Sequence, residues 1–384
     1  MPKVFARPMS SARCHVCGRE SHLISSTLGV CVDCIRNNYP KSQPYIIGAH
    51  TKVRKKFGLP ATPPRAARGV PCTLCANECV IGKDERGYCG LRANSDGAFA
   101  SASSPSEAAL YCYLDPQITN CCAAWFCPAG TGAGYPRYAC KPGPEIGYYN
   151  LAIFLYGCNF DCLYCQNASH KQLEEAPRCS AETLVSMTLE NKQISCWCFF
   201  GGSPEPQLPF ALSASKAVLD SKPENRILRV CFEWNGAGNK VLVERAAELA
   251  LRSGGNIKFD VKCGTDSLSK ALSGVSNRRS FENFEMLFNK YGRQRPELPL
   301  LTATTLLVPG YVDVLEVEKI AIFLADLDRE IPYSLLVFHP DFMMSDLPVT
   351  PYRQVQDCYR AAKKHLASVN IGNLATLGIR SWNV

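Results

Sequence analysis

The feature that most constrains the fold is an alternation of short apolar runs and amphipathic segments over the second half of the chain. The apolar runs are NLAIFLYG, ISCWCFFGG, ILRVCFEWNG, NIKFDVK, LLTATTLLVPG and YSLLVFHP. Between them lie segments with helical periodicity, among them SAETLVSMTLEN, PFALSASKAVLDS, NKVLVERAAELALRS and VDVLEVEKIAIFLADLD. Repeats of a strand and a helix build a parallel sheet, because each helix carries the chain back to the starting end of the sheet. We therefore predict an α/β fold in which residues 149–384 form a partial or complete parallel (β/α) barrel.

Polar motifs directly follow five of the predicted strands. In chain order they are CNFDCLYCQN, GGSPEP, EWNG, DVK and HPD. The carboxyl ends of parallel strands meet at one side of a sheet, and ligand sites form in the loops there. The sequence therefore predicts one functional site at that side.

The first of these loops carries Cys158, Cys162 and Cys165 in the spacing CxxxCxxC. Thiols this close together are typical of a zinc or disulfide staple, or of an iron–sulfur cluster. Three thiolates can hold three irons of a [4Fe-4S] cluster and leave the fourth iron open to an external ligand. The position of the loop, directly after a strand and at the opening of the repeating sheet, favours the cluster.

This triad, with Tyr164 just before its last cysteine, resembles the signature of the radical S-adenosylmethionine (SAM) superfamily. The resemblance implies that the open iron binds the amino and carboxylate groups of SAM. An electron from the reduced cluster then cleaves SAM to methionine and a 5′-deoxyadenosyl radical, which removes a hydrogen atom from a substrate carbon. It also implies a reductant partner such as flavodoxin or ferredoxin.

Further segments within residues 149–373 resemble one branch of that superfamily, typified by pyruvate formate-lyase activating enzyme and the AmmeMemoRadiSam proteins. The segments are FFGGSPEPQLPF, FEWNGAG, FDVK and IPYSLLVFHPDFMMSDLPVTP. The resemblance assigns contacts with SAM to Tyr164, Gly201, Gly202, Ser203, Glu205, Asn235, Asp260, Lys262 and His339. The branch has glutamate where this chain has Ser203. Either Ser203 or a backbone carbonyl then accepts a hydrogen bond from the methionyl ammonium group, and in the second case Glu205 serves elsewhere.

The chain opens with two CxxC pairs, which predict a zinc-ribbon-like module over residues 1–45. Its four cysteines are Cys14, Cys17, Cys31 and Cys34. Residues 46–70 are basic and contain prolines. We interpret them as a solvated linker, in preference to a docking arm for an acidic partner or nucleic acid.

A cysteine-rich region, residues 71–148, precedes the predicted barrel, and its first segment, CTLCANECVIGKDERGYCGLRAN, also resembles the activating-enzyme branch. The thiols of this segment predict a zinc site or a second iron–sulfur cluster, at Cys72, Cys75, Cys79 and Cys89. The next thiols are interpreted as buried or incidental rather than as another metal site, namely Cys112, Cys121, Cys122, Cys127 and Cys140. Three cysteines in predicted strands are interpreted as small hydrophobic residues, namely Cys196, Cys198 and Cys231. Three more receive no role, namely Cys179, Cys263 and Cys358.

Composition narrows the class of protein. The 384 residues include 22 cysteines in clusters typical of metal sites, so we expect reduced thiols and a cytoplasmic location. No apolar run approaches the length of a membrane span, and the first residues lack the apolar stretch of a signal peptide. The formal charge of +8 is partly offset if thiolate–metal sites form, so it is weak support for a nucleic-acid partner.

Three functions remain open from the sequence. The leading hypothesis is a radical SAM enzyme, with activation of a glycyl-radical enzyme as one target and a small molecule or another peptide as the alternative. The second is a zinc or iron–sulfur protein that binds nucleic acid or a protein partner, but the basic linker has few aromatic residues for that role. The third, an electron carrier, would have no use for polar motifs at five strand ends.

Overall fold

A nine-stranded sheet forms the centre of the molecule in a computed structural model that describes residues 11–95 and 97–382. The strand order is β15-β14-β13-β12-β11-β10-β8-β7-β9. Neighbouring strands from β8 to β15 run parallel. Their bounds are β8 Tyr149–Leu155, β10 Ile194–Gly201, β11 Arg229–Trp234, β12 Ile257–Asp260, β13 Leu301–Leu307, β14 Tyr333–Val337 and β15 Val369–Gly372. The predicted α/β fold with a parallel sheet is confirmed, and the sequence missed only its short last strand, β15.

The sheet curves but stays open, because β15 and β9 are its two edges and do not pair with each other. The barrel is therefore partial, one of the two forms predicted. Two antiparallel strands, β7 Glu107–Pro116 and β9 Arg178–Ser180, extend the sheet beyond β8. They were not predicted, because β7 lies in a stretch rich in glycine, proline and scattered cysteine.

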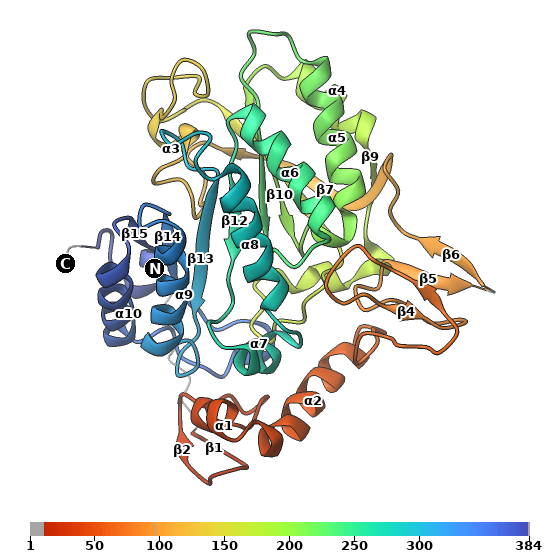
Figure 1. The fold of residues 1–384 in the computed structure, drawn as a ribbon, viewed down its shortest axis with the longest axis vertical. Coiled ribbons are helices and arrows are strands. Elements are labelled where there is room, and N and C mark those ends of the chain that lie inside the picture. The colour runs from red at the N-terminus through yellow and green to blue at the C-terminus, as the bar shows by residue number, and fades with distance from the viewer. Residues whose placement is uncertain (1–10, 96, 383–384) are drawn as a thin grey trace, which may run out of the picture.

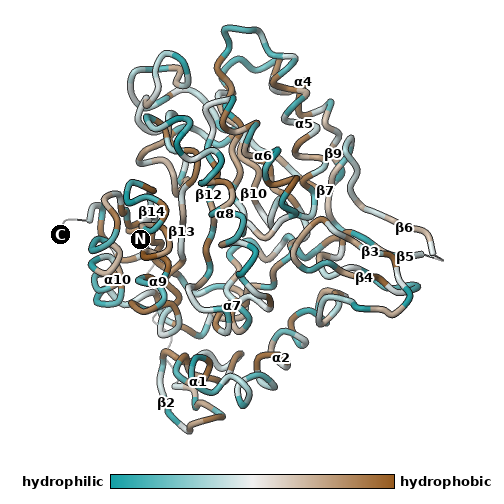
Figure 2. Tube along the Cα trace, in the orientation of Figure 1, coloured by the Kyte–Doolittle hydropathy of each residue, from teal (hydrophilic) through white to brown (hydrophobic). Residues whose placement is uncertain are grey.

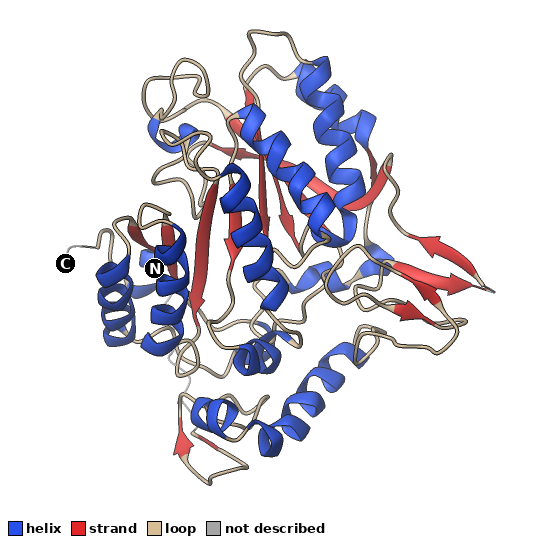
Figure 3. Cartoon of the chain, viewed as in Figure 1, coloured by secondary structure: helices blue, strands red, loops and turns tan. Residues whose placement is uncertain are grey.

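Helices cover the outer face of the sheet in chain order (Figures 1 and 3). Their bounds are α4 Ala181–Glu190, α5 Leu208–Ser221, α6 Lys240–Ser253, α7 Asp266–Ser273, α8 Arg278–Tyr291, α9 Val314–Leu327 and α10 Tyr352–His365. Three of them begin at a side chain that accepts hydrogen bonds from free N–H groups of the first turn. These caps are Ser180, Asn239 and Asp313.

Each central strand has an apolar outer face and a more polar inner face, because successive side chains alternate. In β10, Trp197 and Phe199 are fully buried, and the indole N–H of Trp197 donates to Thr188 of α4. Figure 2 shows apolar residues along the strands and hydrophilic residues on the outward surfaces of the helices. The apolar core thus lies between sheet and helices, which leaves the inner face of the sheet available for polar groups.

The chain before the sheet lies at the carboxyl ends of its strands (Figure 1). It comprises β1 Ala12–Arg13, β2 Glu20–Ser21, α1 Val32–Asn37, α2 Tyr39–Lys55 and the hairpins β3 Val70–Pro71 with β4 Val80–Ile81 and β5 Arg92–Ser95 with β6 Ala98–Ser101. Arg36 fastens this region to the start of helix α9, because its guanidinium contacts Asp313 at 2.7 Å and Glu316 at 2.8 Å. Residues 1–10 of the predicted zinc-ribbon-like module lie outside the described residues.

The first part of residues 46–70, which were predicted to form a solvated linker, is helical in the structure. Helix α2 crosses the predicted boundary at residue 45 and continues to Lys55. Pro40 lies in the first turn, where proline is tolerated, and Ile46, Ala49 and Val53 form a buried apolar stripe. Residues 46–55 are thus a packed helix rather than a solvated spacer.

Residues 117–148, with the short helix α3 Pro128–Thr131, lie at the opposite end of the sheet from the N-terminal region (Figure 1). A buried ion pair fastens this segment to β11, because Arg229 contacts both carboxylate oxygens of Glu145 at 2.8 and 2.6 Å. Ser195 of β10 donates to the same carboxylate at 2.7 Å. The amino ends of the strands are therefore covered by this segment.

Within residues 11–95 and 97–382, no helix combines the length and the apolar character needed to cross a membrane.

Candidate cofactor site at the carboxyl ends of the strands

The loop after β8 places all three cysteines of the CxxxCxxC motif around one cavity of about 140 Å³, which we call the upper cavity. Cys158 and Cys162 are each 9% exposed. No other cysteine among the described residues lines this cavity. The three thiols are free, and their sulfurs do not all lie within 4.8 Å of one another, unlike those of a single-ion site.

This arrangement distinguishes the alternatives that the spacing left open. Four sulfurs around one zinc ion lie about 3.8 Å apart, given Zn–S bonds of about 2.3 Å. Burial raises the pKa of Cys158, and it raises the pKa of Cys165 to about 11, so these thiolates need a positive partner. Wider spacing and buried thiols fit three corners of an iron–sulfur cluster better than a zinc or disulfide staple.

A buried carboxylate inside the motif holds the loop in place. Asp161 accepts a hydrogen bond from His50 at 2.8 Å and pairs with Lys171 at 2.5 Å and Arg54 at 3.3 Å. Burial alone would raise the pKa of Asp161, but the hydrogen bond from His50 and the charges of Lys171 and Arg54 lower it well below its usual range. His50 and Arg54 belong to α2, so the N-terminal region braces the cluster loop directly.

Asn235 connects the loop to the neighbouring strand ends. Its amide donates to Asn159 at 2.7 Å and to Ser203 at 3.0 Å, and its carbonyl oxygen accepts from the amide of Asn159 at 3.2 Å. Asn77 of the pre-barrel region donates to the backbone carbonyl of Asn159 at 2.6 Å. Asn235 and Ser203 both line the upper cavity, where they were predicted.

Gly201 and Gly202 also line the upper cavity, and close packing explains their identity. A Cβ atom on Gly202 would lie 2.1 Å from the carbonyl oxygen of Gly157, and one on Gly201 would lie 2.8 Å from the backbone nitrogen of Leu155. Gly201 has φ +110°, a conformation that favours glycine. Gly201 thus packs against β8 and Gly202 against the start of the cluster loop, and the contact of both glycines with SAM stays a prediction.

One side of the upper cavity is lined by Asp260, the last residue of β12, together with Lys262 and Tyr164. Lys262 pairs with Asp260, and its ammonium lies 5.9 Å from the centre of the Tyr164 ring. Burial would lower the pKa of Lys262, but Asp260 raises it well above the ordinary value. A fixed cation and anion thus face the cavity side by side.

Two residues assigned to SAM binding do not line the upper cavity. Glu205 is fully buried behind the loop after β10, and one of its carboxylate oxygens accepts from the backbone N–H of Gly236 at 2.6 Å. The other oxygen has no partner. His339 follows β14 with its side chain 43% exposed, 3.8 Å from Asp341. Ser203 lines the upper cavity and Glu205 does not, while the acceptor of the methionyl ammonium group stays a prediction.

His170 is a buried residue of the upper cavity that the sequence reasoning missed. Its Nδ1 atom has no hydrogen-bond partner, and burial together with the charge of Lys171 lowers the pKa of His170 well below its ordinary value. A neutral imidazole therefore faces the cavity. Nothing in the local pattern, CQNASHK, marked this histidine, because its place depends on the turn that follows the cysteines.

The N-terminal cysteines form a second candidate metal site. The sulfurs of Cys14, Cys17, Cys31 and Cys34 all lie within 4.8 Å of one another, and the backbone N–H of Cys31 donates to the sulfur of Cys14. This close cluster confirms that the predicted four thiols converge. Its geometry suits one tetrahedrally bound ion, zinc or iron.

The four cysteines of the pre-barrel segment are arranged differently. Among the described residues, no three of Cys72, Cys75, Cys79 and Cys89 bring their sulfurs within 4.8 Å of one another. Burial raises the pKa of Cys75 well above its ordinary value and that of Cys79 to about 11. A single zinc ion does not fit these positions as they stand, so of the two predicted occupants an iron–sulfur cluster fits better.

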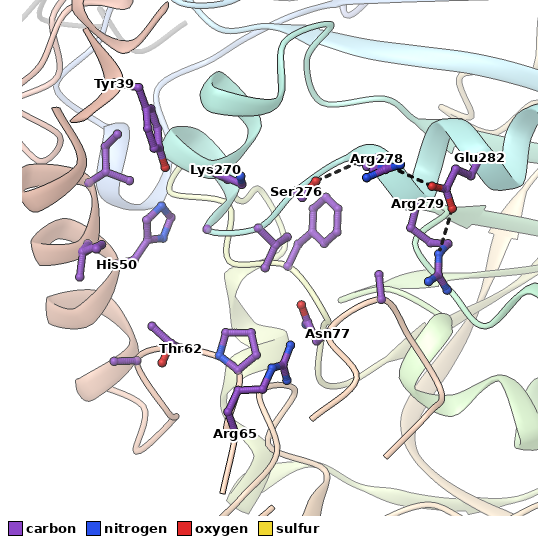
Figure 4. A pocket seen from close by; sticks show the side chains of 18 residues that line it. Tyr39, His50, Thr62, Arg65, Asn77, Lys270, Ser276, Arg278, Arg279 and Glu282 are labelled. Carbon is purple, nitrogen blue, oxygen red and sulfur yellow. Dashed lines mark hydrogen bonds and ion pairs between the residues drawn. The ribbon is translucent and has the colours of Figure 1, made fainter. Parts of the chain in front are cut away.

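A larger cavity of about 470 Å³ lies outside the sheet, between α2 and helices α7 and α8 (Figure 4). Phe160 of the cluster loop lines both this cavity and the upper cavity. Figure 4 shows Arg278 and Arg279 beside Glu282, and both guanidinium groups pair with its carboxylate, at 3.1 and 3.3 Å. Two guanidinium groups thus share one carboxylate at the edge of this cavity.

Residues 152–323 match the radical SAM superfamily. This matched region, which contains the cluster loop, is a radical SAM superfamily domain, in agreement with the resemblance of the three-cysteine motif. The match ends before β14 and begins after the cysteine-rich regions.

Individual relatives share less of the chain. An uncharacterised protein of Methanocaldococcus jannaschii, MJ0808, is 24% identical over 312 residues, which cover 79% of this chain and 81% of the relative. The crystal structure of Streptococcus suis SuiB bound to S-adenosylmethionine has a TM-score of 0.39 and 14% identity, over 56% of this chain and 48% of SuiB. SuiB bound to its precursor peptide SuiA has a TM-score of 0.41 and 12% identity, over 60% of this chain and 51% of SuiB. The similarity thus spans about half of the SuiB chain.

Proposed function

We propose that this protein is a radical SAM enzyme that cleaves SAM reductively at a [4Fe-4S] cluster held by Cys158, Cys162 and Cys165. The observation that carries the proposal is the upper cavity at the carboxyl ends of parallel strands. Those three cysteines line it, and no fourth cysteine of the part of the chain that the structure describes does so. When bound together, the cluster and SAM supply a 5′-deoxyadenosyl radical for hydrogen abstraction.

The residues of the chain prepare this cavity in distinct ways. Two residues of the cluster loop hold it in place. Asp161 contacts His50 of α2, and Asn159 contacts Asn235. Asp260 and Lys262 place opposite charges side by side, which suits a zwitterionic ligand such as the methionyl group of SAM. The neutral His170 adds a hydrogen-bonding group without adding charge. Together they form a cavity that orients a charged ligand.

The target of hydrogen abstraction is the finer part of the proposal. The activating-enzyme resemblance supports a glycine in a partner enzyme, and the same chemistry on a small molecule or another peptide is the alternative. Incubation with SAM and each candidate target, followed by electron paramagnetic resonance (EPR), distinguishes them. A stable glycyl radical on a partner enzyme supports activation, whereas a product formed from a small molecule or another peptide, without a stable glycyl radical, supports the alternative.

SAM cleavage itself tests the coarser proposal. We expect the protein, reconstituted anaerobically with iron and sulfide and then reduced, to convert SAM to 5′-deoxyadenosine. Cys162→Ala removes one of only three cluster ligands, so formation should fall to the background of the reductant alone. The product is measured by liquid chromatography and mass spectrometry.

Cys358→Ala is the matched control, since Cys358 is fully buried in α10 and lines no cavity of the site. It should retain both iron and activity. A reduced preparation that holds iron at the cluster loop but forms no 5′-deoxyadenosine would contradict the proposal.

A further inference from the structure

A second cavity lies on the inner face of the sheet, nearer than the upper cavity to the amino ends of the strands. We call it the lower cavity. It has a volume of about 310 Å³ and shares Asn167, Phe200, Glu233 and Lys258 with the upper cavity. Five cysteines line it, namely Cys121, Cys127, Cys196, Cys198 and Cys231. The sequence interpreted these thiols as incidental or as small hydrophobic residues, so their convergence on one cavity is a finding of the structure.

One wall of the lower cavity consists of strand cysteines. Cys198 of β10 and Cys231 of β11 are partners in the parallel register, and the sulfur of Cys231 lies 3.7 Å from that of Cys196. The backbone N–H of Asn256 donates to the sulfur of Cys231 at 3.4 Å. These three cysteines are buried in a cluster of their own, separate from the main apolar core. They therefore face the inside of the sheet, not the helices.

The opposite wall is a loop within residues 117–148, which cover the amino ends of the strands. Its thiols are Cys121 and Cys127, with Cys122 next to them, and the ligand atoms of Cys121, Cys122 and Glu233 lie within 4.8 Å of one another. Ser334 of β14 donates to the carbonyl of Cys122 at 2.8 Å, and the indole of Trp125 donates to the same carbonyl at 3.0 Å. These two hydrogen bonds hold the loop backbone at Cys122.

Lys258 links the two walls. Its ammonium nitrogen lies 3.2 Å from the sulfur of Cys121 on the loop and 3.0 Å from the sulfur of Cys198 on β10. Glu233 lies 3.4 Å from the same nitrogen. A buried cation between thiols marks a place where negative charge on sulfur is favourable, as it is in a metal-bound thiolate.

The N-terminal site of the same chain shows what a single-ion site looks like. There, four sulfurs lie within 4.8 Å of one another. In the lower cavity, five thiols surround a space of about 310 Å³ and a sixth lies beside them. A zinc ion binds four ligands at close distance and leaves no such space between them. The lower cavity has more thiols than one zinc ion binds, and they lie around a wider space. A group of several atoms with thiolate ligands fits this cavity better.

We propose that the lower cavity binds an auxiliary iron–sulfur cluster, with ligands from both the strand wall and the loop wall. Lys258 offsets part of the negative charge of the thiolate-ligated cluster and donates to its sulfur atoms, an interaction that tunes the reduction potential of such centres. The cluster lies beneath the cavity that the radical chemistry uses, separated from it only by shared side chains such as Phe200.

The test removes the radical cluster first, so that it does not depend on SAM cleavage. The full-length background variant carries Cys158→Ala, Cys162→Ala and Cys165→Ala. The variant is reconstituted anaerobically with iron and sulfide. The contents of iron, acid-labile sulfide and zinc per chain are then measured, and Mössbauer spectra are recorded. We expect the added pair Cys198→Ala and Cys231→Ala to remove about two or four irons with equal sulfide. The pair Cys121→Ala and Cys127→Ala should remove the same amount.

The matched control pair is Cys263→Ala and Cys358→Ala, two fully buried cysteines that do not line the lower cavity. It should leave the iron of the background variant unchanged. Circular dichroism checks folding, and Cys198→Ser in the otherwise unchanged protein gives a second measurement, because a serine ligand should alter the Mössbauer and EPR spectra. Unchanged iron in both cavity pairs, or loss of zinc in place of iron, would overturn the proposal.

Discussion

Ser203 and Glu205 show how a departure from a motif is resolved by position. Ser203 lines the upper cavity and accepts from the amide and the backbone N–H of Asn235. Glu205 is turned away, with one oxygen on Gly236 and the other without a partner. Burial raises the pKa of Glu205 to about 7. Burial thus disfavours the ionised form of this internal acid.

The raised pKa of Glu205 predicts a specific pH dependence. An acid whose pKa is higher in the folded state than in the unfolded chain favours folding while it is protonated, below the unfolded pKa of about 4.3. That stability is lost as pH rises through about 7, at a cost on the order of 3 kcal/mol above it. Glu205→Gln should thus become more stable than the parent at pH 8 and differ little at pH 5. Anaerobic urea unfolding at both values measures the difference.

Glu224→Gln, on an exposed loop, is the control and should change stability equally little at both values. A parent protein that gains stability between pH 5 and pH 8 relative to Glu205→Gln would contradict the assignment.

Helix α2 has a larger role than its sequence indicated. Two of its residues, His50 and Arg54, contact Asp161 between the cluster cysteines. Arg54 also donates to the carbonyl of Tyr88 and lies 3.5 Å above the Tyr88 ring, which ties the pre-barrel segment into the same contact. The helix therefore connects two cysteine-containing segments.

Asp161→Asn tests this brace. It leaves Arg54 and Lys171 buried without their shared anion, so we expect a loss of about 3–5 kcal/mol in unfolding free energy at pH 7. Because the pKa of Asp161 is lowered, its contribution is complete above the unfolded pKa of about 3.9 and declines as pH falls further. The difference between variant and parent should therefore shrink in acid. Urea unfolding at pH 7 and pH 3 measures it.

Asp266→Asn provides a comparison for that measurement. Asp266 pairs with Lys270 one helical turn away at the surface, with its side chain 47% exposed. Such pairs contribute about 0–1 kcal/mol. Equal losses in the two variants would show that Asp161 is not a brace.

The molecule as a whole encloses the inner face of its sheet at both ends. The N-terminal region covers the carboxyl ends of the strands, and residues 117–148 cover the opposite ends (Figure 1). Each cover is fastened by an ionic contact with low exposure, Arg36 with Glu316 at one end and Arg229 with Glu145 at the other. The two cavities of the inner face are therefore sheltered by segments outside the repeating barrel.

The N-terminal cover should depend on its metal. Strands β1 and β2 have two residues each and α1 has six, too little to fold without a bound ion. Cys14→Ser with Cys34→Ser should therefore make residues 11–55 sensitive to limited proteolysis, while the barrel remains resistant. Mass spectrometry of the fragments locates the cleavage sites.

Cys112→Ser with Cys179→Ser is the matched pair, since both thiols lie in β7 and β9, far along the chain from the module. It should leave the proteolysis pattern unchanged. Resistance of residues 11–55 in the first pair would mean that packing on the barrel, not the ion, maintains this cover.

The barrel and the cluster loop could be predicted because their signals are local. Each parallel strand up to β14 is an apolar run, and the three cysteines follow the first of them directly. Strand β15 was missed because Val369–Gly372 is short and contains Asn370. Helix α2 was missed because prolines and basic residues concealed its apolar stripe.

The lower cavity could not be predicted, because its walls come from separate parts of the sequence. Cys121 and Cys198 become neighbours only when the loop before β8 folds under the sheet. Their patterns, CC in a loop and CWC in a strand, have no recognisable metal-site spacing. His170 was missed for the same reason, since side-chain direction after a turn is set by tertiary packing.

Because side chains alternate along each strand, the side chains on its inner face line the two cavities at different positions along the strand. Along β10 and the residue that follows it, Cys198 lines the lower cavity, Phe200 lines both cavities and Gly202 lines the upper cavity, in steps of two residues of about 6.6 Å each. A substitution at one level can enlarge or reshape its own chamber without moving the backbone that supports the other. Such a scaffold can accept a new substrate above while whatever is held beneath stays as it was.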